Sequence, residues 1–285
     1  MSGPSSSNYS ARTNLLPRGC GWLALRSFLL LLFASTPLRA DSSFAQGTLG
    51  AGTRWETPFH IIESKNPGPT VLITGGLHGN EPAGAHAAEQ IRRWRITKGK
   101  LVVIPRVNVP GLKKGTRYLP EVERALRDLN RNFPRTGKAN EARGELAKMI
   151  WKFAQKQKPT WVLDLHEGFH FHQINEDSVG STIIDANTKP ADAVIPSMLA
   201  AVNKTIPDQK KKFLRLRSAV NGSLSRAARD RLGAAAMTLE TTFREQPLAL
   251  RARQHRIMVH ALLSQLGMIE ADEPHLIAPS AEKNR

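Results

Sequence analysis

The sequence predicts an α/β fold, in which a mixed, mostly parallel β-sheet carries helices on both faces. Short apolar or β-branched runs, which are typical of buried strands, alternate along the chain with longer segments whose apolar residues recur at helical spacing. Such alternation favours parallel strands covered by helices on both sides. The composition is 40% hydrophobic and 23% charged, which is that of a globular protein and excludes coiled-coil and collagen-like structures.

Thr57–Glu63 and Thr70–Thr74 are the first two predicted strands, and a Lys-Asn-Pro-Gly-Pro turn separates them. A helix with a regular apolar stripe is predicted over Ala83–Trp94, followed by a strand over Leu101–Pro105. The stretch 106–143 is rich in Gly, Pro, Arg and Asn and shows no sustained period. We expect it to be a long loop that is either functional or disordered.

The second half of the chain continues the alternation. Its predicted strands are Trp161–Leu165, Ser181–Asp185 and Ala234–Leu239. Its predicted helices are Glu145–Gln157, Ala191–Val202, Ser223–Leu232 and Leu248–Leu266. Pro196 interrupts the pattern of the second of these helices. We expect one α/β domain over 46–270 and a loose polar tail over 271–285.

Residues 1–45 are expected to be a signal peptide and a flexible N-terminus. Arg12, Arg18 and Arg26 precede an uncharged apolar run at 27–34, and cleavage is expected after Ala40 or Ala45. A membrane-spanning helix needs about 20 apolar residues, so we expect no stable transmembrane span. The expected location is therefore periplasmic or extracellular, with a short uncleaved N-terminal anchor as the alternative.

The charge and the cysteine content narrow the possible partners. Lysine and arginine exceed aspartate and glutamate by 41 to 24, so the net charge of +17 favours anionic partners. The basic runs at 210–212 and 251–256 lack the interleaved aromatic residues of a nucleic-acid site, so no specific nucleic-acid partner is expected. An anionic cell-envelope polymer is the alternative partner. The single cysteine, Cys20, excludes a disulfide framework.

Histidine and glutamate side chains follow three of the predicted strands. His78 and Glu81 lie in the turn after Thr70–Thr74. His166 follows Trp161–Leu165, and Glu240 follows Ala234–Leu239. Sites in α/β sheets form where the carboxyl ends of strands meet. His78, Glu81 and His166 then match the donors of a catalytic zinc with one position left for water. Zinc lowers the pKa of such a water to about 7, and Glu240 would accept its proton.

The long loop carries residues suited to an anionic substrate. Arg131 presents a planar fork that fits a carboxylate, and Asn130 adds a neutral donor beside it. Asp128 is placed to accept a hydrogen bond from the far nitrogen of a metal-bound histidine. The alternative is a solvated basic loop in which Asp128 and Asn130 only cap a helix.

Five motifs, in this order, resemble those of zinc carboxypeptidase-like hydrolases and look most like the succinylglutamate desuccinylase/aspartoacylase family. They are Gly-Leu-His78-Gly-Asn-Glu81-Pro, Thr-Arg117-Tyr, Asp128-Leu-Asn130-Arg131, Asp-Leu-His166 and Thr-Leu-Glu240. The match spans roughly residues 57–243. The resemblance implies a zinc carboxypeptidase-like, or phosphorylase/hydrolase-like, fold and makes 46–270 the zinc hydrolase catalytic domain.

The resemblance also implies a role for each matching residue. His78, Glu81 and His166 correspond to the ligands of one zinc ion per chain, and Glu240 corresponds to the catalytic base. Asp128 corresponds to the outer hydrogen-bond partner of the first histidine.

The remaining matches concern the substrate. Asn130 and Arg131 correspond to the clamp that holds the substrate carboxylate. Arg117 corresponds to the arginine that polarises the scissile carbonyl and holds its oxyanion. Arg124 and Arg127 compete for that role, because an insertion separates Thr-Arg-Tyr from Asp-Leu-Asn-Arg.

Two departures from the family limit the prediction of a substrate. Only 45 residues follow Glu240, whereas aspartoacylase-like enzymes carry a sizeable C-terminal β domain. Carboxypeptidases proper have a tyrosine shortly before the catalytic glutamate, and the only tyrosines here are Tyr9 and Tyr118.

We expect an exported zinc-dependent hydrolase that cleaves an amide or peptide bond adjacent to a free carboxylate, as a deacylase or a carboxypeptidase. Its substrate would be a small molecule or a peptide. The alternative is a catalytically silent relative that binds an anionic cell-envelope polymer through its basic face.

A second zinc motif occurs at the same strand end. The segment from His166 to His170 reads His-Glu-x-x-His, which binds zinc only when it is helical. Gly168 and the preceding strand disfavour a helix there. We therefore expect His170 and His172 to line the rim of the pocket or to be exposed.

Overall fold

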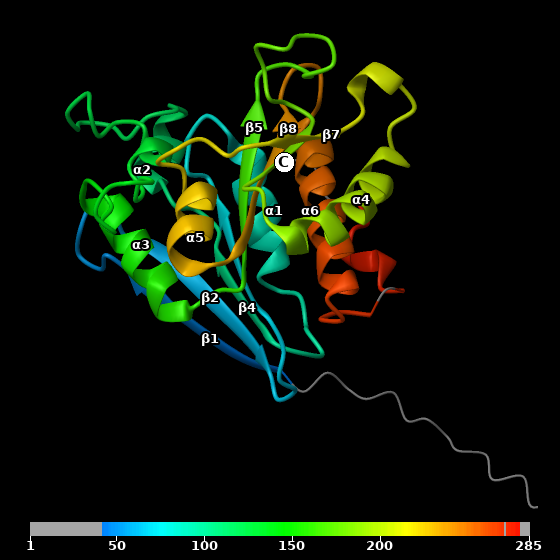
Figure 1. Ribbon diagram of the computed structural model, residues 1–285, viewed down its shortest axis with the longest axis horizontal. Coiled ribbons are helices and arrows are strands. Elements are labelled where there is room, and N and C mark those ends of the chain that lie inside the picture. Colours follow the sequence, from blue (N-terminus) through cyan, green and yellow to red (C-terminus); the bar gives the residue numbers. More distant parts are fainter. Residues whose placement is uncertain (1–41, 271, 280–285) are drawn as a thin grey trace, which may run out of the picture. The chain divides into compact units, whose positions relative to one another are not determined.

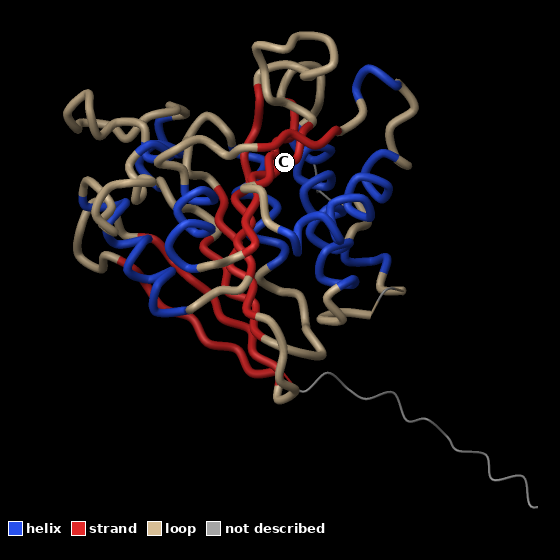
Figure 2. Tube along the Cα trace, in the orientation of Figure 1, coloured by secondary structure: helices blue, strands red, loops and turns tan. Residues whose placement is uncertain are grey.

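The computed structural model describes residues 42–270 and 272–279, which form an eight-stranded sheet between two layers of helices (Figures 1 and 2). The strands are β1 (Ser42–Leu49), β2 (Thr57–Ser64), β3 (Thr70–Gly75), β4 (Lys100–Ile104), β5 (Trp161–Gly168), β6 (Thr182–Asp185), β7 (Leu214–Arg217) and β8 (Ala235–Thr242). Their order across the sheet is β1-β2-β4-β3-β5-β8-β6-β7. The central strands β4, β3, β5 and β8 are parallel, whereas β1, β2 and β6 run antiparallel to their inner neighbours. The predicted mixed, mostly parallel sheet is confirmed.

The described residues form six α-helices. They are α1 (Pro82–Ile91), α2 (Val109–Lys114), α3 (Glu145–Gln157), α4 (Lys189–Asn203), α5 (Leu224–Leu232) and α6 (Leu248–Gln265). Helices α1, α4 and α6 bury their apolar residues on one face, and α3 and α5 on the other. Adjacent side chains of a strand point to opposite faces, so Ile73 belongs to the first core and Leu72 to the second.

The structure adds three elements that the sequence patterns did not predict: β1, β7 and α2. Strand β1 begins at Ser42, ahead of residue 46, where the domain was expected to start. The possible cleavage point after Ala45 falls within this strand, and the apolar run at 27–34 lies outside the described residues. The loop 106–143 contains α2 and a 3-10 turn at Leu129–Arg131.

The polar tail lies against α6 as far as the structure describes it, and the expectation that it is loose was wrong for this part. A 3-10 turn forms at Pro274–Leu276, and Arg256 donates to the backbone carbonyls of Leu276 and Ala278. Arg253 donates to the carbonyl of Ile277 in the same way. No helix within the described ranges is both long and apolar enough to cross a membrane.

The central strands bring the site residues to one edge. In the β5–β8 pair, His166 lies opposite Glu240, and β3 ends beside β5 with Gly75 opposite Leu165. Helix α1 approaches β5 closely at Gly84, where a Cβ atom would lie 2.3 Å from the carbonyl oxygen of Leu165. Only glycine allows this contact, and it holds the turn that precedes α1 next to the end of β5.

Candidate metal centre and active site

A buried cluster of His78, Glu81 and His166 lies at the carboxyl ends of β3 and β5. His78 and Glu81 belong to the turn between β3 and α1, which is closed by a bond from the Glu81 N–H to the His78 carbonyl, and His166 belongs to β5. Pro82 occupies the first position of α1, where its missing N–H costs nothing. One ligand atom from each of the three residues lies within 4.8 Å of the others. The cluster could therefore hold a metal ion.

Glu81 joins the two imidazoles directly. Its two carboxylate oxygens lie 2.8 Å from His78 Nδ1 and 2.7 Å from His166 Nδ1. Burial opposes the ionisation of Glu81, but the two histidines outweigh it and hold the pKa of this carboxyl well below its usual range. Burial likewise opposes the protonation of His166, but the carboxylates of Asp164 and Glu81 raise its pKa well above the ordinary value.

Each histidine has a carboxylate on its far nitrogen. His78 Nε2 lies 3.2 Å from Asp128 Oδ1, and His166 Nε2 lies 2.8 Å from Asp164 Oδ2. Thr74 donates to the other oxygen of Asp164. Such carboxylates fix the tautomer of a metal-bound histidine and increase its basicity. The Nδ1 atoms of both histidines face the Glu81 carboxylate, and a second carboxylate contacts the Nε2 atom of each ring. This arrangement fits the His2Glu donor set of zinc.

Asp164 was missed by the sequence analysis. It lies two residues before His166 on the same strand, and the two-residue period of a strand places both side chains on one face. The two-residue spacing of Asp164 and His166 is the sequence feature from which this contact could have been predicted.

Asp128 and Arg117 close the cluster from the long loop. Asp128 begins the 3-10 turn by accepting from the Asn130 N–H, and its carboxylate also faces Arg117 Nη2 at 3.6 Å. Burial opposes ionisation of Asp128, but the bond from His78 and the nearby Arg117 and Arg131 lower its pKa to about 2. It is therefore an anion at neutral pH.

The structure separates the three arginines that competed for the oxyanion role. Arg117 Nη1 donates to Glu81 Oε1 at 2.8 Å and lines the same cleft as the histidines. The guanidinium of Arg127 lies instead over the ring of Tyr118, and Arg124 is exposed outside the lining of the cleft.

Glu240 reaches the cleft from β8. It is 7% exposed, and its pairing with His166 across the strands brings it to the cluster. Burial, reinforced by the negative charges of Glu81 and Asp164, raises its pKa to about 8. In the metal-free protein this carboxyl holds its proton at neutral pH.

Asn130 and Arg131 line the same cleft. The Asn130 amide accepts from the Leu224 N–H, and its Nδ2 lies 3.2 Å from His166 Nε2. Because His166 Nε2 donates to Asp164, it cannot accept from Asn130, and the amide hydrogens of Asn130 remain for another acceptor. Arg131 Nη1 donates to the Asn130 carbonyl, which holds the guanidinium over the cleft. The cleft has a volume of about 130 Å³, and apolar side chains of Val179, Ile184 and Val220 complete its lining.

The His-Glu-x-x-His segment is not helical, as expected. His166 and Glu167 belong to β5, and His170 follows the strand, where its Nδ1 accepts from the Phe171 N–H. His172 is held by the Ser178 carbonyl, and neither His170 nor His172 lines the cleft. Glu167 has a different set of contacts, since its side chain bonds to Arg251 and to the Ala83 N–H.

The sheet and the donor cluster at its carboxyl edge define a zinc carboxypeptidase-like fold. The model of the succinylglutamate desuccinylase/aspartoacylase catalytic domain matches residues 67–266. The chain therefore belongs to this family of hydrolases.

Individual relatives are distant. An N-alpha-acetyl-L-2,4-diaminobutyric acid deacetylase from Halomonas elongata is 29% identical over 113 residues, which are 38% of this chain and 31% of that protein. Among solved structures, Csd4 of Helicobacter pylori, described as a D,L-carboxypeptidase, has a TM-score of 0.56 and 20% identity and matches 71% of this chain and 52% of its own. A succinylglutamate desuccinylase/aspartoacylase from Rhodobacter sphaeroides has a TM-score of 0.54 and 20% identity, with coverages of 80% and 66%. The chain thus spans about a third of the curated relative and half of Csd4.

Proposed function

We propose that this chain is an exported zinc-dependent hydrolase that cleaves an amide or peptide bond next to a free carboxylate. The observation that carries the proposal is the meeting of the buried His2Glu donors with Glu240, Arg117 and Arg131 in one cleft. A zinc ion held by the three donors would supply a Lewis acid and a water of lowered pKa. Family membership supports the hydrolytic reaction.

Glu240 serves as the proton carrier in this proposal. Its carboxyl lies beside the donor cluster, and a cation held there favours the ionised form, which lowers the pKa from the value of about 8 in the metal-free protein. The carboxylate then accepts a proton from the attacking water and passes it to the leaving nitrogen.

Arg117 and Arg131 divide the negative charges of the substrate between them. Arg117 is anchored beside Glu81, so its guanidinium faces the oxygen that becomes negative when the carbonyl is attacked. Arg131 also lines the cleft and binds the free carboxylate through its fork, with the free amide hydrogens of Asn130 as added donors.

The substrate that we propose is an N-acyl amino acid or a short peptide with a free carboxylate. The Halomonas relative is named for an N-acetylated amino acid, and Csd4 structures are described with a bound tripeptide and as a D,L-carboxypeptidase. All of these molecules carry an amide near a carboxylate. Export, proposed from the apolar run at 27–34, favours peptides over intracellular N-acyl amino acids.

Metal content tests the donor set. The purified chain, prepared without chelators, should hold one zinc ion, and His78→Ala should lose most of it. His170→Ala is the matched control, because it removes the second histidine of the His-Glu-x-x-His segment, and it should retain the metal. Zinc kept in His78→Ala but lost in His170→Ala would overturn the assignment of the ligands.

Paired substrates test the carboxylate requirement. N-acyl amino acids and dipeptides with a free carboxylate should be cleaved, and the same molecules with a C-terminal carboxamide should not. Arg131→Gln should raise KM for the free acids by one to two orders of magnitude, since it removes a charged, bidentate contact. Equal rates on acid and amide substrates would contradict the proposed recognition.

A further inference from the structure

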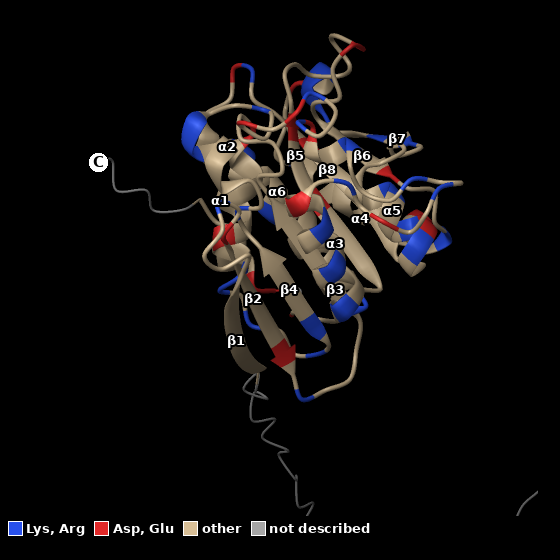
Figure 3. Ribbon diagram, turned by 90° about the vertical axis from the view of Figure 1, so that its left-hand side faces the viewer, with Lys and Arg blue, Asp and Glu red and all other residues tan. Residues whose placement is uncertain are grey.

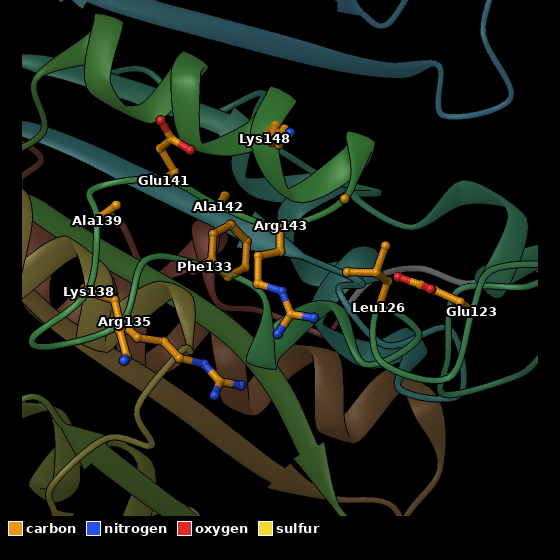
Figure 4. A pocket seen from close by; sticks show the side chains of 11 residues that line it. Glu123, Leu126, Phe133, Arg135, Lys138, Ala139, Glu141, Ala142, Arg143 and Lys148 are labelled. Atoms are coloured by element: carbon orange, nitrogen blue, oxygen red, sulfur yellow. The ribbon is translucent and has the colours of Figure 1, made fainter.

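The long loop forms a second cavity beyond the active-site cleft. Its later part, together with the first turn of α3, encloses about 630 Å³, a size typical of small-molecule sites (Figure 4). The charged side chains that line it are Arg135, Lys138, Arg143, Lys148, Glu123 and Glu141. The half-buried Leu126 adds an apolar side chain to the lining, and the buried Phe133 lies beneath it. We call this cavity the basic pocket.

The cations of the basic pocket have no acidic partners. Within the described ranges, no ion pair of 4.0 Å or less involves Arg135, Lys138, Arg143 or Lys148, although two glutamates line the same cavity. Four unpaired cations around one hollow produce a positive potential that attracts anions.

The walls that carry these cations are fixed by hydrogen bonds. The Arg231 guanidinium donates to the backbone carbonyls of Arg135 and Lys138, and Thr136 donates to Asp230. The Arg143 N–H donates to the Asn132 carbonyl at 2.7 Å. A site whose walls are already ordered loses less conformational entropy when a ligand binds.

The positive surface continues along α3. Lys148, Lys152 and Lys156 recur every four residues on this helix, and Figure 3 shows basic residues in successive turns of it. A hollow of about 480 Å³ that is lined by Lys148 and Lys152 adjoins the basic pocket through their shared residues Glu141 and Ala142.

We propose that the basic pocket binds an oxyanion group, a phosphate or a carboxylate, of a small molecule whose apolar part rests on Leu126. The pocket and the cleft share no lining residue, but the short segment 131–135 connects them. Arg131 lines the cleft, Arg135 lines the pocket, and Arg135 donates to the carbonyl of Arg131. The ligand is either a free anion or the far end of a long substrate. Its binding does not depend on the hydrolase assignment.

The test is calorimetric titration of the full chain with inorganic phosphate and, separately, with citrate at low ionic strength. The pocket variant is Lys138→Gln/Arg143→Gln/Lys148→Gln, in which all three positions are exposed, so folding should be preserved. The matched control is Lys204→Gln/Lys210→Gln/Lys212→Gln, which removes the same charge elsewhere. Arg131→Gln reports binding in the cleft.

The pocket variant should bind at least tenfold more weakly than the parent, whereas the control should bind as the parent does and Arg131→Gln should lose only the binding that belongs to the cleft. Equal affinity in the pocket and control variants, loss in Arg131→Gln alone, or no binding by the parent would overturn the proposal. The probe that binds more tightly shows whether the pocket prefers a phosphate or a carboxylate. Competition between the bound anion and a substrate, seen as a raised KM at constant kcat, would identify the ligand as the far end of that substrate.

Discussion

Glu167, the residue after His166, forms a buried ion pair with Arg251 of α6. The two side chains are 0% and 11% exposed. The second oxygen of Glu167 accepts from the Ala83 N–H at the start of α1, and the Glu167 N–H donates to Glu81 Oε2. One residue thus ties α6, α1 and β5 together around the donor cluster.

Removal of one member of this pair should be costly. Arg251→Met leaves the Glu167 carboxylate buried without a counter-charge, and we expect a loss of about 3–5 kcal/mol in the free energy of unfolding. The double variant Glu167→Gln/Arg251→Met should recover part of the loss, because glutamine can still accept from Ala83. Urea denaturation of the three proteins measures both values, and a double variant as unstable as Arg251→Met would refute this account.

Glu240→Gln should separate catalysis from metal binding. The substitution removes the proton acceptor while keeping the size of the side chain, so kcat should fall by about 10²–10⁴-fold. Zinc content should stay at the parental level. Glu245→Gln, an exposed change with the same loss of charge, is the control for activity. Activity kept by Glu240→Gln would remove this residue from the mechanism.

The same carboxyl should make the stability of the metal-free protein depend on pH. Glu240 ionises at about 8 in the folded chain, against an ordinary value of 4.5. Between these values the folded state binds one proton more than the unfolded state. The contribution of Glu240 to the free energy of unfolding is therefore present in full below pH 4.5. It is lost as the pH rises to 8, at up to about 1.4 kcal/mol per pH unit. The raised pKa of His166 acts in the same direction above 6.5.

Unfolding of chelator-treated protein between pH 6.5 and 8 measures this effect, because the lowered pKa of the buried His255 acts in the opposite direction below 6.5. The free energy of unfolding of the parent should decrease as the pH rises, and that of Glu240→Gln should decrease less steeply. Parallel curves for the two proteins would show that the Glu240 carboxyl is already ionised in the folded state.

Asp164→Asn should weaken metal binding without removing a ligand. The carboxylate fixes His166 through its far nitrogen, and loss of such a partner typically reduces metal affinity by about 10–100-fold. Competition with a chromophoric chelator gives the affinity. Asp185 is another buried aspartate, which pairs with Arg215. Asp185→Asn is therefore the control, and it should bind metal as the parent does. Equal affinities for both variants would contradict the proposed support of His166.

Much of the fold could be predicted because its central elements are buried. The strands β3, β5 and β8 read as apolar runs, and the predicted and observed bounds of α3 agree at Glu145–Gln157. Strand β1 could not be found in this way, because its residues are only partly buried or exposed and its sequence has no alternation. Strand β7 does alternate, as Leu-Arg-Leu-Arg, but four residues beside a lysine run form a weak signal.

The site was predictable to the extent that its residues follow strands. The expected donors meet because each follows a strand that the pattern located. Asp128 and Arg117 lie against them from the aperiodic loop, where only the motifs and the chemistry of the side chains pointed to them. The partner of Glu167 could not be inferred, since Arg251 lies 84 residues away and its burial arises only from the packing of α6. The basic pocket likewise depends on how an aperiodic loop folds back on α5.

The two edges of the sheet differ in a way that bears on handling the protein. The outermost strand β7 carries Arg215 and Arg217, and charged edge residues discourage strands of other molecules from adding to a sheet. Strand β1, at the other edge, has no charged residue and exposes Phe44 to 56%. Within the part of the chain that the structure describes, self-association by strand addition is therefore favoured at β1, and a lysine in place of Phe44 is the change most suited to suppress aggregation in concentrated samples.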